Sequence, residues 1–280
     1  KPFYEWCVKN NMIFTGHVVE ETSFTGQLAH WGSHLRFYEY QQLPGIDTLS
    51  AQTRMYWIAK QVASAGHQLG RKRLLDEHLG TFGWTINFET MKQQGDWQVL
   101  EGINLRTPHL SWYTMEGAAK RDFPASISFQ SSWYKDYKQV EDYFARMATL
   151  LYEGEPARDV LVVYPIESVA AQIGLGWATG QTGAAPYVKD LEAAYQEIFH
   201  WLNGSHVDFE YGDEEMMSRL ARVGKDAKGP FFAVGQASYR AVVVPKLVTM
   251  RSTTLKLLSE FQQAGGLVVF AGEPPAYVDA

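Results

Sequence analysis

The sequence predicts an α/β protein in which part of a TIM-type (β/α) barrel is followed by a doubly wound parallel sheet. In the first half, short apolar runs alternate with helical stretches, and the runs end in polar side chains, as strands do at the C-terminal face of a barrel. From Asp159 onward the apolar runs become nearly continuous and β-branched, which is typical of strands buried on both faces of a parallel sheet. We therefore expect two domains, 1–154 and 155–280.

The first domain is expected to hold about four β/α units, half of the eight that a closed barrel requires. Apolar residues at spacings of three and four predict its helices, and the irregular segment 23–36 reads as a loop. The expected strands are 12–15, 44–47, 73–77 and 102–105, and the expected helices are 54–69, 88–100 and 133–153.

The second domain is expected to hold one parallel sheet, with 231–234 as a minor strand or hairpin arm. It lacks the signature of a hydrolase nucleophile, since Ser168 has no Gly-x-Ser-x-Gly context and the single cysteine is Cys7. Its glycines fit no phosphate-binding loop. We therefore expect a structural domain that braces the first one or mediates association into a homo-oligomer. The expected strands are 160–164, 207–211, 241–244 and 267–270, and the helices 188–203, 214–222 and 253–264.

Composition excludes several classes of function. A net charge of −6 and an isoelectric point near 5.8 argue against a nucleic-acid partner, and no apolar run reaches transmembrane length. One cysteine excludes an internal disulfide and a cysteine-based metal cluster. The acidic residues beside His17 and His78 match no metal-ligand spacing, so neither a metal nor a cofactor is expected. The start Lys-Pro-Phe suggests a cut from a longer protein, and the cellular compartment stays open.

Polar side chains gather at the predicted strand ends. These residues have two interpretations. In the first they have structural roles, as surface carboxylates, hydrogen-bonding loop histidines and packing aromatics; in the second they form a barrel active site. Two carboxyl groups that face one pocket would favour the second interpretation. The candidates are His17, Glu20 and Glu21, then Asp47, then Glu77 with Trp84, and finally Asn104, His109 and Tyr113.

Several short motifs resemble the C-terminal half of a clan A glycoside hydrolase barrel, near the family 106 α-L-rhamnosidases and family 42 β-galactosidases. Residues 159–280 resemble the flavodoxin-like domain, related to class I glutamine amidotransferases, that follows the barrel in such enzymes. The motifs are Phe14-Thr15-Gly16-His17 with Glu20, Pro44-Gly45-Ile46-Asp47, Lys60 to Ala65, Glu77 with Gly80 and Gly83-Trp84, Gly102-Ile103-Asn104 with His109, and Asp142 to Arg146.

The resemblance implies that 73–77 is the seventh barrel strand and 102–105 the eighth. Glu77 then takes the place of the catalytic nucleophile of a retaining enzyme, or of the base that activates water in an inverting one. The acid/base would lie on the fourth strand, upstream of Lys1; Glu20 and Glu21, on the fifth strand, are the remaining candidates.

We therefore expect a fragment of a bacterial glycoside hydrolase that lacks the N-terminal half of its barrel. Its expected catalytic residues are Glu77, Glu20 and Glu21, and its ligand is a carbohydrate. The alternative is a non-catalytic carbohydrate-binding or assembly module on the same scaffold. The expected substrate-binding residues are His17, Asp47, Trp84, Asn104, His109 and Tyr113.

Overall fold

A computed structural model describes residues 1–50, 55–109, 111, 114, 116–117, 127–174 and 186–279. Contacts within the chain divide it into two compact units, which interleave along the sequence. The division into domains 1–154 and 155–280 stays a prediction. The first unit comprises Lys1–Val18, Gln41–Ala63 and Lys72–Glu155, and the second comprises Val19–Tyr40, Ser64–Arg71 and Pro156–Ala280.

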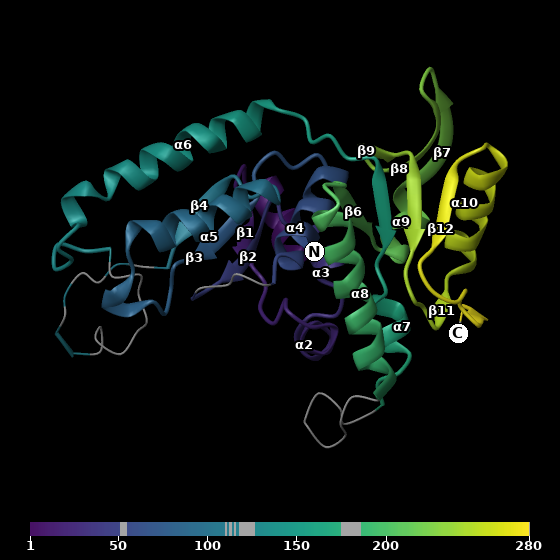
Figure 1. The fold of residues 1–280 in the computed structure, drawn as a ribbon, viewed down its shortest axis with the longest axis horizontal. Helices are drawn as coiled ribbons and strands as arrows, with labels where there is room; N and C mark the ends of the chain where they lie inside the picture. The colour runs from purple at the N-terminus through teal and green to yellow at the C-terminus, as the bar shows by residue number, and fades with distance from the viewer. Residues whose placement is uncertain are drawn as a thin grey trace. The chain divides into compact units, whose positions relative to one another are not determined.

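The first unit is built on a four-stranded parallel sheet, here called the first sheet (Figure 1). Its strands are adjacent in the order in which the chain makes them, β1-β2-β3-β4. Successive parallel strands joined by helices are the arrangement of a (β/α) barrel, so this part of the fold prediction is confirmed. The strands are β1 (Thr15–His17), β2 (Leu43–Thr48), β3 (Leu75–His78) and β4 (Leu105–Pro108).

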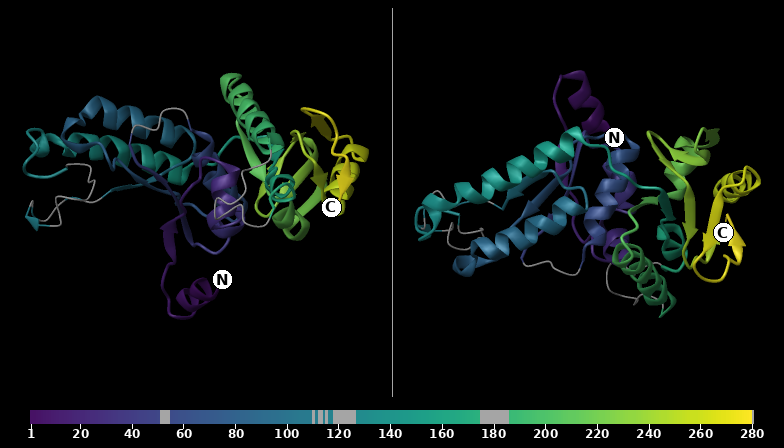
Figure 2. Two further views of the ribbon diagram at one scale, coloured as in Figure 1. Left: turned by 90° about the horizontal axis from the view of Figure 1, so that it is seen from below. Right: turned by 45° about the horizontal axis from the view of Figure 1, so that its top comes forward.

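Helices α5 (Phe88–Leu100) and α6 (Lys138–Glu153) of the first unit lie side by side (Figures 1 and 2). Asn87 begins α5 by accepting a hydrogen bond from the backbone N–H of Thr90 at 2.9 Å. The two helices approach closely at Gly95, where an added Cβ would lie 2.2 Å from Cζ of Phe144. The unit also contains α1 (Pro2–Lys9), the start of α4 (Trp57–Gln68), and the 3-10 turns η1 (Gly83–Thr85) and η3 (Tyr134–Asp136).

Three expected strands of the first sheet begin later than predicted, and the smallest difference is at β3, which begins at Leu75 instead of residue 73. Residues 12–15 were expected to form a strand, but Met12 and Ile13 are exposed and β1 begins at Thr15. The run 102–105 was also wrong, because β4 begins at Leu105. Both runs were predicted as strands because they are apolar. In the structure, Asn104 lies before β4, and its side chain bonds to the backbone at Leu74 and Lys72.

The second unit contains a four-stranded parallel sheet, here called the second sheet, in the order β12-β10-β5-β6. The prediction that these strands form one parallel sheet is confirmed. Two neighbours of β5 come from later in the chain and lie on opposite sides of it, so the strand order reverses at β5. The strands are β5 (Val160–Val163), β6 (Phe209–Gly212), β10 (Ala241–Val244) and β12 (Leu267–Phe270).

Helices cover both faces of the second sheet. Leu161 and Val163 pack in one core cluster with Phe261 of α10 (Ser252–Gln263). Phe209, which pairs in register with Val160, faces the other way and contacts the ring of Phe199 on α8 (Pro186–Gly204). Alternation along the strands therefore explains why both faces are apolar.

Several elements of the second unit were missed by the sequence analysis. The predicted loop 23–36 contains α2 (Phe24–His30) and α3 (His34–Tyr38), because Ser23 caps α2 and apolar residues on both helices are buried. The expected helix 214–222 ends early as α9 (Glu214–Leu220), and the chain continues into an antiparallel sheet. Residues 231–234 are a hairpin arm of that sheet, as expected. It comprises β7 (Ala221–Asp226), β8 (Gly229–Val234) and β9 (Ala237–Tyr239); α7 (Ile166–Ala170), β11 (Thr249–Met250) and β13 (Tyr277–Val278) complete the unit.

Candidate active site

Four polar side chains gather at the carboxyl edge of the first sheet, and we call them the strand-end cluster. His17 ends β1, Asp47 and Glu77 are the penultimate residues of β2 and β3, and His109 directly follows β4. Asp47 and Glu77 are register partners, so they stand side by side on strands about 4.8 Å apart. In parallel strands that follow one another, such residues share one end of the sheet, where barrel enzymes place their chemistry.

His17 and Glu77 share a proton at this edge. Nδ1 of His17 donates to the carbonyl oxygen of Val18 at 2.7 Å, because a carbonyl oxygen accepts only. Nε2 of the same ring lies 2.8 Å from Oε2 of Glu77. A neutral imidazole has a single N–H, so the second contact needs a further proton, on the ring or on the carboxyl group.

The carboxyl group of Asp47 has a raised pKa. Burial raises the pKa of the Asp47 carboxyl group, and the charge of Glu77 raises this pKa further. His17, with Nδ1 3.8 Å from Oδ2 of Asp47, and His109 act in the opposite direction. A carboxyl group whose pKa is raised is suited to donate a proton to a ligand bound at this edge.

His109 closes the cluster on the side of β4. Its Nε2 lies 3.8 Å from Oε1 of Glu77, and its backbone N–H donates to the carbonyl oxygen of His78 at 2.7 Å. Gly80 permits this position, because an added Cβ there would lie 2.9 Å from Cβ of His109 and 2.4 Å from a methyl group of Leu49. The loops after β2, β3 and β4 therefore pack tightly at Gly80, three residues after Glu77.

The opposite side of β3 carries a buried polar layer that the sequence analysis missed. Oδ2 of Asp76 accepts hydrogen bonds from Thr48 at 2.6 Å and from the side-chain amide of Gln98 on α5. His78, which is fully buried on this side, stays neutral because burial lowers its pKa well below the usual value, and Arg106 lowers it further. Glu77 alone of the run 76–78 faces the cluster, as the alternation along a strand predicts. The glutamines at positions 94 and 98, one helical turn apart, were the available signal for this layer.

Asn104 does not belong to the cluster, and a role for it in substrate binding stays a prediction. It precedes β4 and so lies at the amino end of the sheet. Its Oδ1 accepts from the backbone N–H of Leu74 at 2.9 Å, and its Nδ2 donates to the carbonyl oxygen of Lys72 at 2.6 Å. The side chain thus joins the entries of β3 and β4.

The other candidates lie elsewhere. Trp84 is exposed in η1, on the loop that follows β3, and Tyr113 falls outside the described residues. Glu20 and Glu21 belong to the second unit, where Glu20 is exposed with φ 61°. Glu21 is buried there. Burial of Tyr38 raises the pKa of its hydroxyl group, and the charge of Glu21 raises this pKa further.

The described part of the chain shows neither a metal centre nor a membrane-spanning helix. Within those residues, no three His, Cys, Asp or Glu side chains converge so as to hold a metal ion. No helix there combines the length and apolar character needed to cross a membrane. Ser168, at the turn after β5, is buried and structural: its hydroxyl donates to the carbonyl oxygen of Thr249 and accepts from the N–H groups of Val248 and Thr249.

No protein-family model and no curated protein matches this chain. Among solved structures, a rhamnosidase from Novosphingobium sp. PP1Y is similar over 99% of the chain, with 16% identity and a TM-score of 0.69. A catalytic mutant of a GH42 β-galactosidase from G. stearothermophilus is similar over 96% of the chain, with 14% identity and a TM-score of 0.58. The chain spans 24% of the rhamnosidase chain and 38% of the galactosidase chain. It therefore has a glycoside hydrolase-like fold, a partial α/β barrel followed by a parallel-sheet domain.

Proposed function

We propose that the chain is part of a glycoside hydrolase and that Glu77 is its essential carboxylate. The single observation that carries the proposal is the placement of Glu77 at the carboxyl edge of the first sheet, bonded to His17 and flanked by Asp47 and His109. The fold shared with a rhamnosidase and a β-galactosidase supports the reaction class. The resemblance of the motifs supports the role of Glu77.

The geometry suits the carboxylate step of glycoside hydrolysis. With the shared proton on His17, Glu77 is an ionised carboxylate held by a charge-assisted hydrogen bond. In that form it attacks the anomeric carbon of a sugar or activates a water molecule. Asp47, His17 and His109 line the same edge and bind sugar hydroxyl groups. The acid that protonates the leaving oxygen comes from another barrel strand, as the resemblance implies.

The test measures the activity of the full encoded polypeptide and its variants. The substrates are aryl α-L-rhamnosides and aryl β-D-galactosides. Glu77→Gln keeps the shape and hydrogen bonding of the side chain but removes the charge that stabilises an oxocarbenium-like transition state. We expect a loss of at least about a thousandfold in kcat/KM, which corresponds to ~4 kcal/mol. Glu155→Gln, at an exposed position after α6, is the matched control. Near-normal turnover by folded Glu77→Gln would remove Glu77 from the mechanism and favour Glu20 or Glu21.

The second candidate is a non-catalytic carbohydrate-binding or assembly module. One observation bears on it: over the residues that the structure describes, the first sheet has four strands, half of the number in a closed barrel. Binding of both sugars without hydrolysis by the encoded polypeptide would support this candidate.

A further inference from the structure

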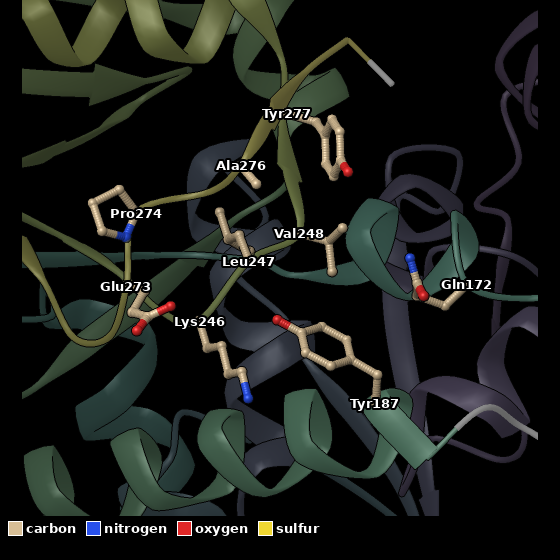
Figure 3. Close-up of a pocket in the computed structure, with 9 residues that line it drawn as sticks. All are labelled: Gln172, Tyr187, Lys246, Leu247, Val248, Glu273, Pro274, Ala276 and Tyr277. Atoms are coloured by element: carbon tan, nitrogen blue, oxygen red, sulfur yellow. The ribbon is translucent and has the colours of Figure 1, made fainter.

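The second unit contains a cavity of about 730 Å³, which we call the second-unit pocket (Figure 3). It lies beyond the carboxyl ends of β10 and β12 and is bounded by segments 246–248 and 273–277, by Tyr187 at the start of α8, and by Gln172 after α7. The strand order of the second sheet reverses between β5 and β10. Open α/β sheets bind ligands outside the carboxyl ends of their strands, at such a reversal. The pocket therefore has both the place and the size of a small-molecule site.

The walls of the pocket are fixed by the fold. The hydroxyl group of Ser168 makes three hydrogen bonds to the backbone of Val248 and Thr249 and so holds this wall in place. Residues 273–277 form the other wall, which is fixed to the first. The N–H of Tyr277 donates to the carbonyl oxygen of Val248 at 3.2 Å, and β13 pairs with β11. Gly272, with φ 146°, allows the turn past Lys246 that precedes this return. A site held in this way needs little ordering when a ligand enters.

The lining combines an apolar floor with a polar rim. Leu247 and Val248 lie between the polar side chains that stand around them (Figure 3). The carboxylate of Glu273 accepts hydrogen bonds, the ammonium group of Lys246 donates them, and the amide of Gln172 does both. The tyrosines 187 and 277 add two aromatic rings with hydroxyl groups. Sugars need this combination, because their hydroxyl groups donate and accept while their C–H faces pack on aromatic rings.

The charges of the pocket disfavour an anionic ligand. Among the described residues that line the pocket, Lys246 is the single cation; its Nζ lies 3.7 Å from Oδ2 of Asp190 and 4.7 Å from the centre of the Tyr187 ring. Glu273 adds a second carboxylate at the rim. A phosphorylated or carboxylated ligand would therefore meet net negative charge here. A neutral ligand rich in hydroxyl groups would not be repelled by this charge.

From this geometry we propose that the second-unit pocket is a saccharide-binding site for about one or two neutral sugar rings. It is built from residues of the second unit and does not involve Glu77. The proposal stands independently of the catalytic role proposed for Glu77.

The test is a titration of the isotopically labelled 280-residue chain with L-rhamnose and with D-galactose, followed by amide chemical shifts. We expect saturable shifts of residues 246–248 and 273–277 for at least one of the two sugars. Tyr277→Ala and Glu273→Gln should weaken this binding at least about tenfold. Both side chains are exposed, so neither variant should unfold the protein. Tyr134→Ala, at an exposed tyrosine of the first unit, and Glu77→Gln should leave the binding unchanged.

Three results would overturn the proposal. The first is the absence of shifts at the pocket with either sugar, and the second is binding there that survives both pocket variants. The third is a pocket that responds to inorganic phosphate and to neither sugar. Shifts confined to residues 17, 47, 77 and 109 would overturn the pocket as well, while supporting the proposed function of the strand-end cluster.

Discussion

At the scale of single residues, the second unit holds a buried carboxyl group that should make its stability depend on pH. Glu214 begins α9 and accepts a hydrogen bond from the backbone N–H of Arg251 at 2.8 Å. Burial raises its pKa to about 7, against hydrogen bonds from Arg251 and Thr254, and the charges of Glu167 and Asp213 add to the rise. The folded protein therefore binds this proton more tightly than the unfolded chain does. The resulting stability is complete below pH 4.5 and is lost as the pH rises through about 7.

We predict that Glu214→Gln removes this dependence. The glutamine oxygen can still accept from Arg251, but it carries no buried charge at high pH. The variant should gain up to about 3 kcal/mol in free energy of unfolding, relative to the wild type, between pH 5 and pH 8. Urea unfolding at both pH values measures the difference. Glu215→Gln is the control, because hydrogen bonding to Arg219 lowers the pKa of Glu215. A wild-type-like pH profile of Glu214→Gln would contradict the assignment.

At the strand-end cluster, the sequence identified residues better than it identified their neighbours. His17, Asp47, Glu77 and His109 were predicted because polar side chains that follow apolar runs mark strand ends. Asn104 satisfied the same rule but precedes its strand, since a boundary error of three residues moves a side chain to the other end of the sheet. The proton shared by His17 and Glu77 depends on side-chain distances, which the order of residues does not contain.

At the scale of elements, the packing of α5 on α6 depends on Gly95. We predict that Gly95→Ala destabilises the first unit by about 1–3 kcal/mol, because its Cβ would overlap the ring of Phe144, which is buried. Thermal unfolding measures the effect. Gly204→Ala is the control: this helical glycine of α8 has open space around it, so alanine there should be neutral or stabilising. Equal melting temperatures for the two variants would contradict the prediction, because they would show that α5 and α6 accommodate the added methyl group without loss of stability.

The type of an element was easier to predict than its limits. The four strands of the second sheet were found because burial on both faces gives continuous apolar runs. The helix α6 was found because one of its faces is apolar and the other charged. The hairpin of β7 and β8 was missed in part, since the half-exposed β7 carries no apolar run and its partner is specified by tertiary pairing. The short helices α2 and α3 likewise depend on burial against the rest of their unit.

At the scale of the whole molecule, the first unit exposes apolar side chains in and after α1, and among the described residues β1 pairs with β2 alone. Phe3 and Trp6 of α1, and Ile13 before β1, are between 55% and 74% exposed, and β1 pairs with β2 on one side. Apolar surface of this kind marks an interface. We propose that further β/α units of the same polypeptide cover it and continue the barrel past β1.

We predict that the backbone amides of α1 and β1 exchange hydrogen more slowly in the polypeptide as encoded than in the 280-residue chain. Covering the helix and pairing the free strand edge would both suppress local opening. Hydrogen exchange followed by mass spectrometry measures the difference, and α10 in the second unit is the internal reference. Equal exchange of α1 and β1 in the two proteins would exclude this surface as the seam of a larger barrel.

The role of Glu77 can be tested most directly by chemical rescue. In Glu77→Ala, the missing carboxylate leaves space that a small anion can occupy. We predict that azide or formate restores turnover of an activated aryl glycoside by Glu77→Ala in a concentration-dependent way, and that Asp47→Ala shows no such rescue. The measurement is the rate of aryl release against anion concentration in the encoded polypeptide, with the glycosyl product identified. Failure of both anions to rescue folded Glu77→Ala, together with rescue of Asp47→Ala, would contradict the account and transfer the essential carboxylate to β2.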